Sequence, residues 1–391
     1  MMYQVKLFNK ISHTATDKLA EKSYVCGEEL EKYDAALVRS ANLHDTEFPA
    51  ALKCIARAGA GVNNIPLDRC SERGIVVFNT PGANSNAVKE LVIGSLILAS
   101  RDVIGGIDWT KGLAGTENIG AAAEKGKNQF VGPEIAGKKL GVIGLGAIGV
   151  KVANAAIGLE MEVWGYDPYL SVDGALSLSR AVKHITNVNE IFENCDYITL
   201  HVPLVDATRH IINEDSIGRM KEGVRIINIA RGELVDEDAM CAALSCGRVA
   251  RYVTDFATNE MLAQRNAIVM PHLGASTPES EDNCARMAAR CIMDYLETGT
   301  IRNSVNFPTL KVPYEGGYRI CLIHRNVPNM LASITGRLSA KGVNIENMGN
   351  RSRGDYAYTI IDASHDPTAD ELEALRTLNG MISVRVLPHF N

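Results

Sequence analysis

The sequence that decides the fold is LGVIGLGAIG, residues 140–149. Four apolar residues of the kind that form a buried parallel strand lead directly into a G-x-G-x-x-G turn. Gly144 permits the tight turn, Gly146 lets the backbone approach a pyrophosphate, and Gly149 lets the next helix pack closely on the strand. The first N–H groups of that helix have no partner within it and suit phosphate oxygens. The stretch therefore predicts a dinucleotide-binding βαβ unit.

An acidic residue at the appropriate spacing strengthens this prediction. Asp167 ends the next apolar run, 18 residues beyond Gly149. A carboxylate there accepts hydrogen bonds from the adenosine ribose hydroxyls and repels a 2′-phosphate. No Arg or Lys follows in residues 168–171, so the sequence favours NAD over NADP. The alternative is an ordinary glycine turn followed by a surface acid.

Short apolar runs on both sides of this motif predict an α/β fold built around parallel strands. Strands are expected at 35–38, 54–57 and 76–78 before it and at 163–167, 197–202, 225–230 and 252–256 after it, with a helix at 85–101. Residues 112–137 are rich in Gly, Ala and charge, which is typical of an exposed connection.

The last part of the chain has a different pattern. Two prolines and a glycine pair interrupt it at 303–317, which predicts a linker at 306–317. Apolar runs and helical patterns then follow in the order βαββαβ, which is typical of a ferredoxin-like domain. We therefore expect a separate domain at 318–391.

Composition excludes several classes of protein. The 391 residues carry a net charge of −6 and are 46% hydrophobic, which predicts a globular protein without a footprint for nucleic acid or an anionic membrane. The longest apolar run, 91–99, is too short to span a membrane, and the N-terminus lacks the pattern of a secretory signal. Nine cysteines without a CxxC pair favour free thiols, no metal and a cytoplasmic setting.

Three residues after the glycine turn supply the chemistry of hydride transfer to a keto acid. Arg231 suits a substrate carboxylate and polarises a carbonyl. His272 suits proton exchange with the hydroxyl, and Glu260 beside it would hold the imidazole in one tautomer and favour its charged form. Each also has a plain alternative: an ion pair of Arg231 with Asp236, a solvated Glu260, and a capped loop at His272.

With these motifs the chain resembles the D-isomer-specific 2-hydroxyacid dehydrogenases over nearly its whole length. The resemblance rests on VRS 38–40, RAGAGVNN 57–64, NTP 79–81, ELV 90–92, the glycine turn, ARG 230–232 and PHLGAST 271–277.

The resemblance implies a role for each matching residue. Arg231, Glu260 and His272 would form the catalytic set. Residues that would touch NAD are Thr80, Gly144, Gly146, Ala147, Ile148, Gly149, Asp167, Ala230, Asp255, Gly274 and Ala275. Residues that would bind substrate are Ser40, Arg57, Ala60, Gly61 and Val62, the last three through backbone N–H groups.

The resemblance also implies the fold and the reaction. Two Rossmann-like lobes are expected, a substrate lobe of 1–103 and 284–305 and an NAD lobe of 104–283, with a cleft between them that closes and excludes water. The expected reaction is NAD-dependent oxidation of 3-phosphoglycerate to 3-phosphohydroxypyruvate, the first step of phosphorylated L-serine biosynthesis.

Cations in the substrate lobe would bind the phosphate, and the candidates are Arg39, Arg57 and Arg73. Two alternatives stay open. One is a related dehydrogenase that acts on glycerate or hydroxypyruvate, for which Arg57 would be dispensable. The other is an NAD-sensing binding or corepressor module.

The C-terminal βαββαβ segment resembles an ACT domain, a module that senses small molecules. The resemblance implies contacts of His324, Asn326 and Asn344 with an L-serine effector, and a homodimer or homotetramer. Asn329 stands where glycine is usual, and Asn tolerates a left-handed backbone better than most residues. The alternative is a domain that serves only oligomerisation.

Overall fold

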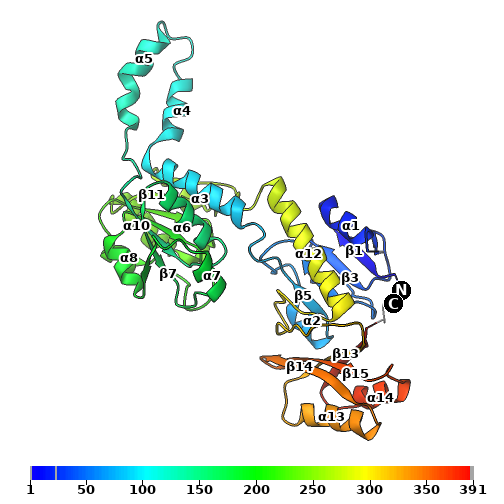
Figure 1. Ribbon diagram of the computed structural model, residues 1–391. Coiled ribbons are helices and arrows are strands. Elements are labelled where there is room, and N and C mark those ends of the chain that lie inside the picture. Colours follow the sequence, from blue (N-terminus) through cyan, green and yellow to red (C-terminus); the bar gives the residue numbers. More distant parts are fainter. Residues whose placement is uncertain (1, 23, 388–391) are drawn as a thin grey trace. The chain divides into compact units, whose positions relative to one another are not determined.

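The computed structural model describes residues 2–22 and 24–387 and divides the chain into two compact units. Unit 1 combines residues 1–83 with 281–391, and unit 2 comprises residues 84–280. Each unit contains a parallel sheet (Figure 1), as the α/β prediction requires. No helix in the described part of the chain is long and apolar enough to cross a membrane.

Unit 2 is built on a seven-stranded parallel sheet in the order β12-β11-β10-β9-β6-β7-β8. Its strands are β6 (Lys139–Ile143), β7 (Glu162–Tyr166), β8 (Lys183–Ile185), β9 (Tyr197–Leu200), β10 (Val224–Asn228), β11 (Val249–Thr254) and β12 (Ala267–Val269). The chain order reverses at β6, which pairs with β7 on one side and β9 on the other. Ligands of such sheets bind at the carboxyl ends of the strands at this point.

The helices of unit 2 are α3 (Ser85–Ser100), α4 (Val103–Lys111), α5 (Ile119–Gly126), α6 (Gly149–Gly158), α7 (Val172–Ser177), α8 (Val188–Asn194), α9 (Glu214–Arg219), α10 (Glu237–Ser245) and α11 (Asn259–Leu262), with short 3₁₀ turns η1 (Lys127–Phe130) and η2 (Gly232–Leu234). Most of them lie around the sheet, whereas α4 and α5 project away from it (Figure 1). Neither α4 nor α5 has a buried residue. The exposed connection expected at 112–137 is therefore partly helical.

Unit 1 contains two sheets. The first is parallel, in the order β2-β1-β3-β4-β5, with β1 (Gln4–Phe8), β2 (Val25–Gly27), β3 (Ala35–Val38), β4 (Cys54–Arg57), β5 (Val76–Phe78), α1 (His13–Ala20), α2 (Leu67–Glu72) and the long helix α12 (Pro278–Thr298). The predicted strands at 35–38, 54–57 and 76–78 are confirmed to the residue.

The second sheet of unit 1 is antiparallel, in the order β14-β15-β13-β16. Its elements are β13 (Tyr318–Arg325), α13 (Met330–Ala340), β14 (Ile345–Arg353), β15 (Tyr356–Ala363), α14 (Ala369–Arg376) and β16 (Met381–Val386). The predicted βαββαβ order is confirmed, and the last residues of the predicted domain, 388–391, lie outside the described residues.

The two compact units differ from the expected division, because the residues expected as a separate domain, 318–391, fall in unit 1, and the first segment of unit 1 ends at residue 83 instead of 103. Helix α3 belongs to unit 2, because Val92 and Leu96 pack in one core with Leu140 of β6. The expected linker at 306–317 is partly packed, since Phe307 and Val312 are buried in the core of unit 1. Other residues of the segment, such as Lys311, Pro313 and Glu315, are exposed.

Candidate active-site residues

The glycine turn after β6 has the geometry that its sequence predicts. Gly144 has a φ of 95°, and a Cβ there would lie 2.6 Å from the His201 carbonyl oxygen. A Cβ on Gly149 would lie 1.8 Å from the Gly144 oxygen. A Cβ on Gly146, in contrast, would meet no protein atom within 4 Å. Gly144 and Gly149 are therefore required by the protein itself, whereas Gly146 leaves space for a ligand.

The first turn of α6 presents donors beside this space. No side chain caps the helix at Ile148, so its first N–H groups suit an anion such as a pyrophosphate. Ala147 is exposed and Ile148 half-buried at this end. The residues present thus fit the phosphates of a dinucleotide.

Asp167 lies directly after β7 and is tied to the glycine turn. Its Oδ2 accepts the Leu145 N–H at 2.8 Å and its Oδ1 accepts the Tyr169 N–H at 2.8 Å. These bonds orient the carboxylate while its remaining lone pairs stay available for hydroxyl donors. The spacing predicted from the sequence thus does place an acid against the turn.

Asp255, at the end of β11, has an unused oxygen. The side chain is 2% exposed and its Oδ2 accepts the Gly274 N–H at 2.9 Å. Its Oδ1 has no hydrogen-bond partner among the described residues. A buried carboxylate oxygen without a donor is costly, so this atom fits a ligand N–H group such as a carboxamide.

The three proposed catalytic residues follow β10, β11 and β12 at the carboxyl edge of the sheet. Arg231 is exposed, and its Nη1 donates to the Ala230 oxygen at 2.6 Å. His272 is exposed, with a left-handed φ of 49° and its ring 5.2 Å from that of Phe256. Glu260 is exposed in α11.

The described part of the chain contains no hydrogen bond or ion pair between Glu260 and His272. The ion pair of Arg231 with Asp236, the plain alternative for Arg231, is also not formed among the described residues. Asp236 instead caps α10 by accepting the Ala239 N–H at 3.0 Å. Asp236 therefore does not support the plain alternative, in which Arg231 only forms an ion pair.

His201 at the end of β9 was missed from the sequence. Its Nε2 lies 3.0 Å from the Thr199 Oγ1, and its buried Nδ1 has no partner among the described residues. Burial lowers the pKa of His201 to about 3, so the ring is neutral at pH 7. A polar residue at a strand's carboxyl end was the available signal.

The substrate residues predicted in unit 1 gather around the turn after β4. A Cβ on Gly59, where φ is 152°, would lie 1.9 Å from the Arg57 Nη1, so the guanidinium covers this glycine. The Ala60 oxygen accepts the Asn79 side-chain N–H at 2.7 Å. Thr80 is fully buried and its Oγ1 has no partner among the described residues. Gly61 and Val62 are half-buried in the same turn.

The three candidate arginines for phosphate have different environments. Arg39 forms an ion pair of 2.5 Å with Glu281. Arg73 donates to the Phe48 oxygen at 3.0 Å and holds a loop. Arg57 Nε donates to the Arg39 oxygen at 3.0 Å, and its Nη1 lies over Gly59 of the turn. The nearby Ser40 is exposed.

The three residues predicted to bind serine have different environments. His324 is 2% exposed; its Nδ1 lies 2.8 Å from the Arg325 oxygen and its Nε2 lies 2.9 Å from the Thr359 Oγ1. Burial lowers the pKa of His324. Asn326 Nδ2 donates to the Gly354 oxygen at 3.0 Å, and Asn344 is exposed. No hydrogen bond joins these three side chains to one another among the described residues.

Asn329 does adopt the expected backbone. Its φ is 64° and it precedes the first turn of α13. The replacement of glycine at this position is therefore accommodated by the left-handed conformation that Asn tolerates.

The chain is similar to known proteins in sequence and in fold. Residues 99–274 match the family "D-isomer specific 2-hydroxyacid dehydrogenase, NAD binding domain". The chain is 32% identical over 343 residues to D-3-phosphoglycerate dehydrogenase of Escherichia coli (strain K12), covering 84% of this chain and 79% of that protein.

Two further proteins extend the comparison. D-3-phosphoglycerate dehydrogenase of Methanocaldococcus jannaschii is 37% identical over 295 residues, covering 72% of this chain and 53% of that protein. The crystal structure of a glyoxylate reductase from Paecilomyes thermophila is 25% identical with a TM-score of 0.64, covering 78% of this chain and 98% of that one.

Proposed function

Because this chain belongs to the D-isomer-specific 2-hydroxyacid dehydrogenase family, we propose that it oxidises 3-phosphoglycerate to 3-phosphohydroxypyruvate with NAD. This reaction is the first step of phosphorylated L-serine biosynthesis. The observation that carries the choice of substrate is the similarity to relatives named D-3-phosphoglycerate dehydrogenase over 84% of the chain. Each residue of the proposed site has a task in this reaction.

Residues of unit 2 hold the cofactor. Asp167 accepts the ribose hydroxyls, the turn at Gly146 and the start of α6 hold the pyrophosphate, and the free Oδ1 of Asp255 accepts an N–H group of the nicotinamide carboxamide. NAD supplies the hydride acceptor when bound. The repulsion of a 2′-phosphate by Asp167 selects NAD over NADP.

His272 acts as the acid/base. Its imidazole takes the proton of the C2 hydroxyl during oxidation and returns it in the reverse reaction. Glu260 is its orienting partner and stabilises the charged ring once the two side chains approach. Arg231 binds the carboxylate and polarises the C2 oxygen.

Residues of unit 1 bind the substrate. Backbone N–H groups of residues 60–62 hold the carboxylate, and Arg57 binds the phosphate, supported by Ser40 and by the placement of its Nη1 over the turn. Arg39 and Arg73 are engaged elsewhere in unit 1 and act as structural residues.

The C-terminal βαββαβ domain is proposed to be an ACT domain that binds L-serine through His324, Asn326 and Asn344. The confirmed strand order supports this proposal. The burial of His324 requires that serine reach it through a rearrangement of its neighbours. We further propose that the protein forms a homodimer or homotetramer and that it is cytoplasmic. The nine cysteines without a pairing pattern favour a reducing compartment such as the cytoplasm.

The test compares NADH oxidation by 3-phosphohydroxypyruvate with that by hydroxypyruvate. We expect kcat/KM to favour the phosphorylated acid by about tenfold or more, about 1.4 kcal/mol of transition-state binding. An equal or reversed preference would move the chain to the glycerate branch of the family. Saturable NADH binding without turnover of either acid would indicate a sensor instead.

A further inference from the structure

Three strands of the C-terminal domain direct donors at the last turn of α12. The donors are Arg319 on β13, Tyr358 on β15 and Arg385 on β16. Their acceptors are backbone oxygens: Thr298 for Arg319 (2.9 Å), Gly299 for Tyr358 (2.7 Å), and Tyr295 and Leu296 for Arg385 (2.8 and 3.2 Å). The last carbonyls of a helix lack partners within it and carry partial negative charge, so two guanidinium groups stabilise this end.

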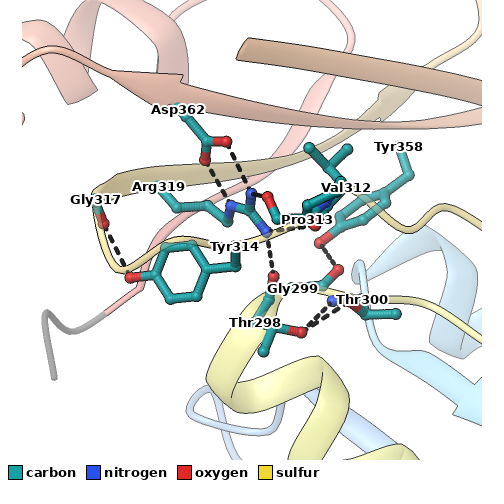
Figure 2. Close-up of polar contacts among 10 residues, drawn as sticks. All are labelled: Thr298, Gly299, Thr300, Val312, Pro313, Tyr314, Gly317, Arg319, Tyr358 and Asp362. Carbon is teal, nitrogen blue, oxygen red and sulfur yellow. Dashed lines mark hydrogen bonds and ion pairs between the residues drawn. The ribbon is translucent and has the colours of Figure 1, made fainter. Parts of the chain in front are cut away.

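Arg319 uses all five of its N–H donors (Figure 2). The side chain is fully buried and forms a two-bond ion pair with Asp362 of β15, at 2.6 and 2.8 Å. Its other donors reach Thr298 O, Val312 O at 3.0 Å and Pro313 O at 2.6 Å. One side chain therefore joins β13, β15, the end of α12 and the segment before β13.

The surroundings of this contact are closely packed. Gly299 has a φ of 72°, and a Cβ there would lie 2.5 Å from the Cys321 Sγ. Beneath it, one hydrophobic core contains Val5 of β1, Ile292 of α12 and Ile360 of β15. The parallel sheet, α12 and the C-terminal sheet therefore share a single core.

We infer that Arg319, Tyr358 and Arg385 form a clamp that fixes the C-terminal domain to α12, so that unit 1 moves as one body. The glycine pair 316–317 then does not act as a hinge, because Arg319 holds the carbonyls that precede it. A ligand or partner that deforms the C-terminal sheet acts on the end of α12 directly through these bonds. This inference does not depend on the proposed reaction.

Hydrogen–deuterium exchange of the full chain tests the clamp. In Arg319→Met we expect amides of 299–301 and 311–320 to exchange at least about tenfold faster, because local opening no longer breaks the ion pair. Peptides of unit 2 such as 139–143 should not change. The control Arg337→Met alters an exposed arginine of α13 and should match the wild type.

Cleavage by a glutamate-specific protease gives an independent measure. Glu315 is exposed but lies two residues after Pro313, whose carbonyl oxygen accepts a hydrogen bond from Arg319. We expect the wild type to resist cleavage there and Arg319→Met to be cut into two fragments. Rapid cleavage of the wild type, at the same rate as the variant, would show a hinge and overturn the inference.

A milder variant covers the case in which Arg319→Met does not fold. Tyr358→Phe removes only the hydroxyl that donates to the Gly299 oxygen. Faster exchange confined to 299–301 would support the clamp. Exchange identical to the wild type in Tyr358→Phe would mean that the bond does not hold this turn, and the clamp would be rejected.

Discussion

The carboxylate of Asp167 accepts the backbone N–H of Leu145 at 2.8 Å, which ties the end of β7 to the glycine turn at the end of β6. The two elements that a dinucleotide would touch, the pyrophosphate turn and the ribose acid, are therefore parts of one hydrogen-bonded unit. A change at Asp167 acts on both.

Asp167→Ala should relax the preference for NAD. The variant removes the negative charge that repels a 2′-phosphate, so we expect the ratio of kcat/KM for NAD to that for NADP to fall by about tenfold or more. Initial rates with each cofactor provide the measurement. Asp173→Ala, at an exposed acid in the first turn of α7, is the control. An unchanged ratio in Asp167→Ala would remove the ribose assignment.

The glycines of the turn should separate folding from cofactor binding. Gly149→Ala puts a Cβ against the Gly144 oxygen, 1.8 Å away in the present geometry, so we expect a lower Tm as well as lost NADH binding. Gly146→Ala meets no protein atom within 4 Å and should keep the wild-type Tm while weakening NADH binding by about tenfold or more. Thermal unfolding and fluorescence titration measure the two effects. Wild-type NADH binding by Gly146→Ala would mean that no ligand occupies this space.

His272 is best tested by asparagine. Its φ of 49° is tolerated better by Asn than by Ala, so His272→Asn keeps the loop while removing the acid/base. We expect kcat to fall by about 10²–10⁴ and NADH titration to remain close to the wild type. Loss of NADH binding instead would give His272 a cofactor role rather than a proton-transfer role.

Arg57→Met should discriminate between substrates. Losing the guanidinium over Gly59 should raise KM for 3-phosphohydroxypyruvate by about tenfold or more and leave KM for hydroxypyruvate nearly unchanged, because only the first substrate carries phosphate. Arg39→Met is the matched control, since it removes an exposed ion pair with Glu281, a type of contact that contributes about 0–1 kcal/mol. Equal effects of Arg57→Met on both acids would contradict the phosphate role.

Much of the fold could be predicted because its central strands are short, continuous apolar runs. Strands β3, β4 and β5 match their predicted bounds, whereas β1, β2, β8 and β12 were missed. Strands β2, β8 and β12 have three residues each and lie at sheet edges, where a periodic pattern is too short to recognise. Strand β1 has five residues, of which only Val5 is buried, so it lacks a continuous buried apolar run. The membership of α3 in unit 2 depends on Val92 and Leu96 meeting β6, a contact that sequence spacing does not encode.

In the candidate site, too, some features could be predicted from the sequence and others could not. Motif spacing placed Asp167 and Gly149 correctly relative to one another, because both act through backbone geometry close to β6. The contact of Glu260 with His272 depends on one side chain from α11 and one from the segment after β12, and no bond joins them among the residues that the structure describes. His201 belongs to no recognisable motif, although, like other site residues, it follows the carboxyl end of a strand, here β9.

Stability should fall in mild acid through His201. Burial lowers the pKa of His201 to about 3 from the ordinary value of about 6.5, and the buried Nδ1 has no acceptor for a proton among the described residues. Between these two pKa values the unfolded chain binds a proton that the folded chain does not. This contribution to the free energy of unfolding is therefore complete above pH 6.5 and is lost as the pH falls toward 3.

The measurement is denaturant unfolding of the wild type and of His201→Gln at pH 7 and pH 5. Gln retains a polar group that can reach the Thr199 hydroxyl but does not titrate. We expect the wild type to lose about 2 kcal/mol more than His201→Gln between the two pH values. The difference between the two proteins is the informative quantity, because every other titrating group is common to both. Equal losses in the two proteins would show that His201 is protonated in the folded state and that its ring is not shielded from water.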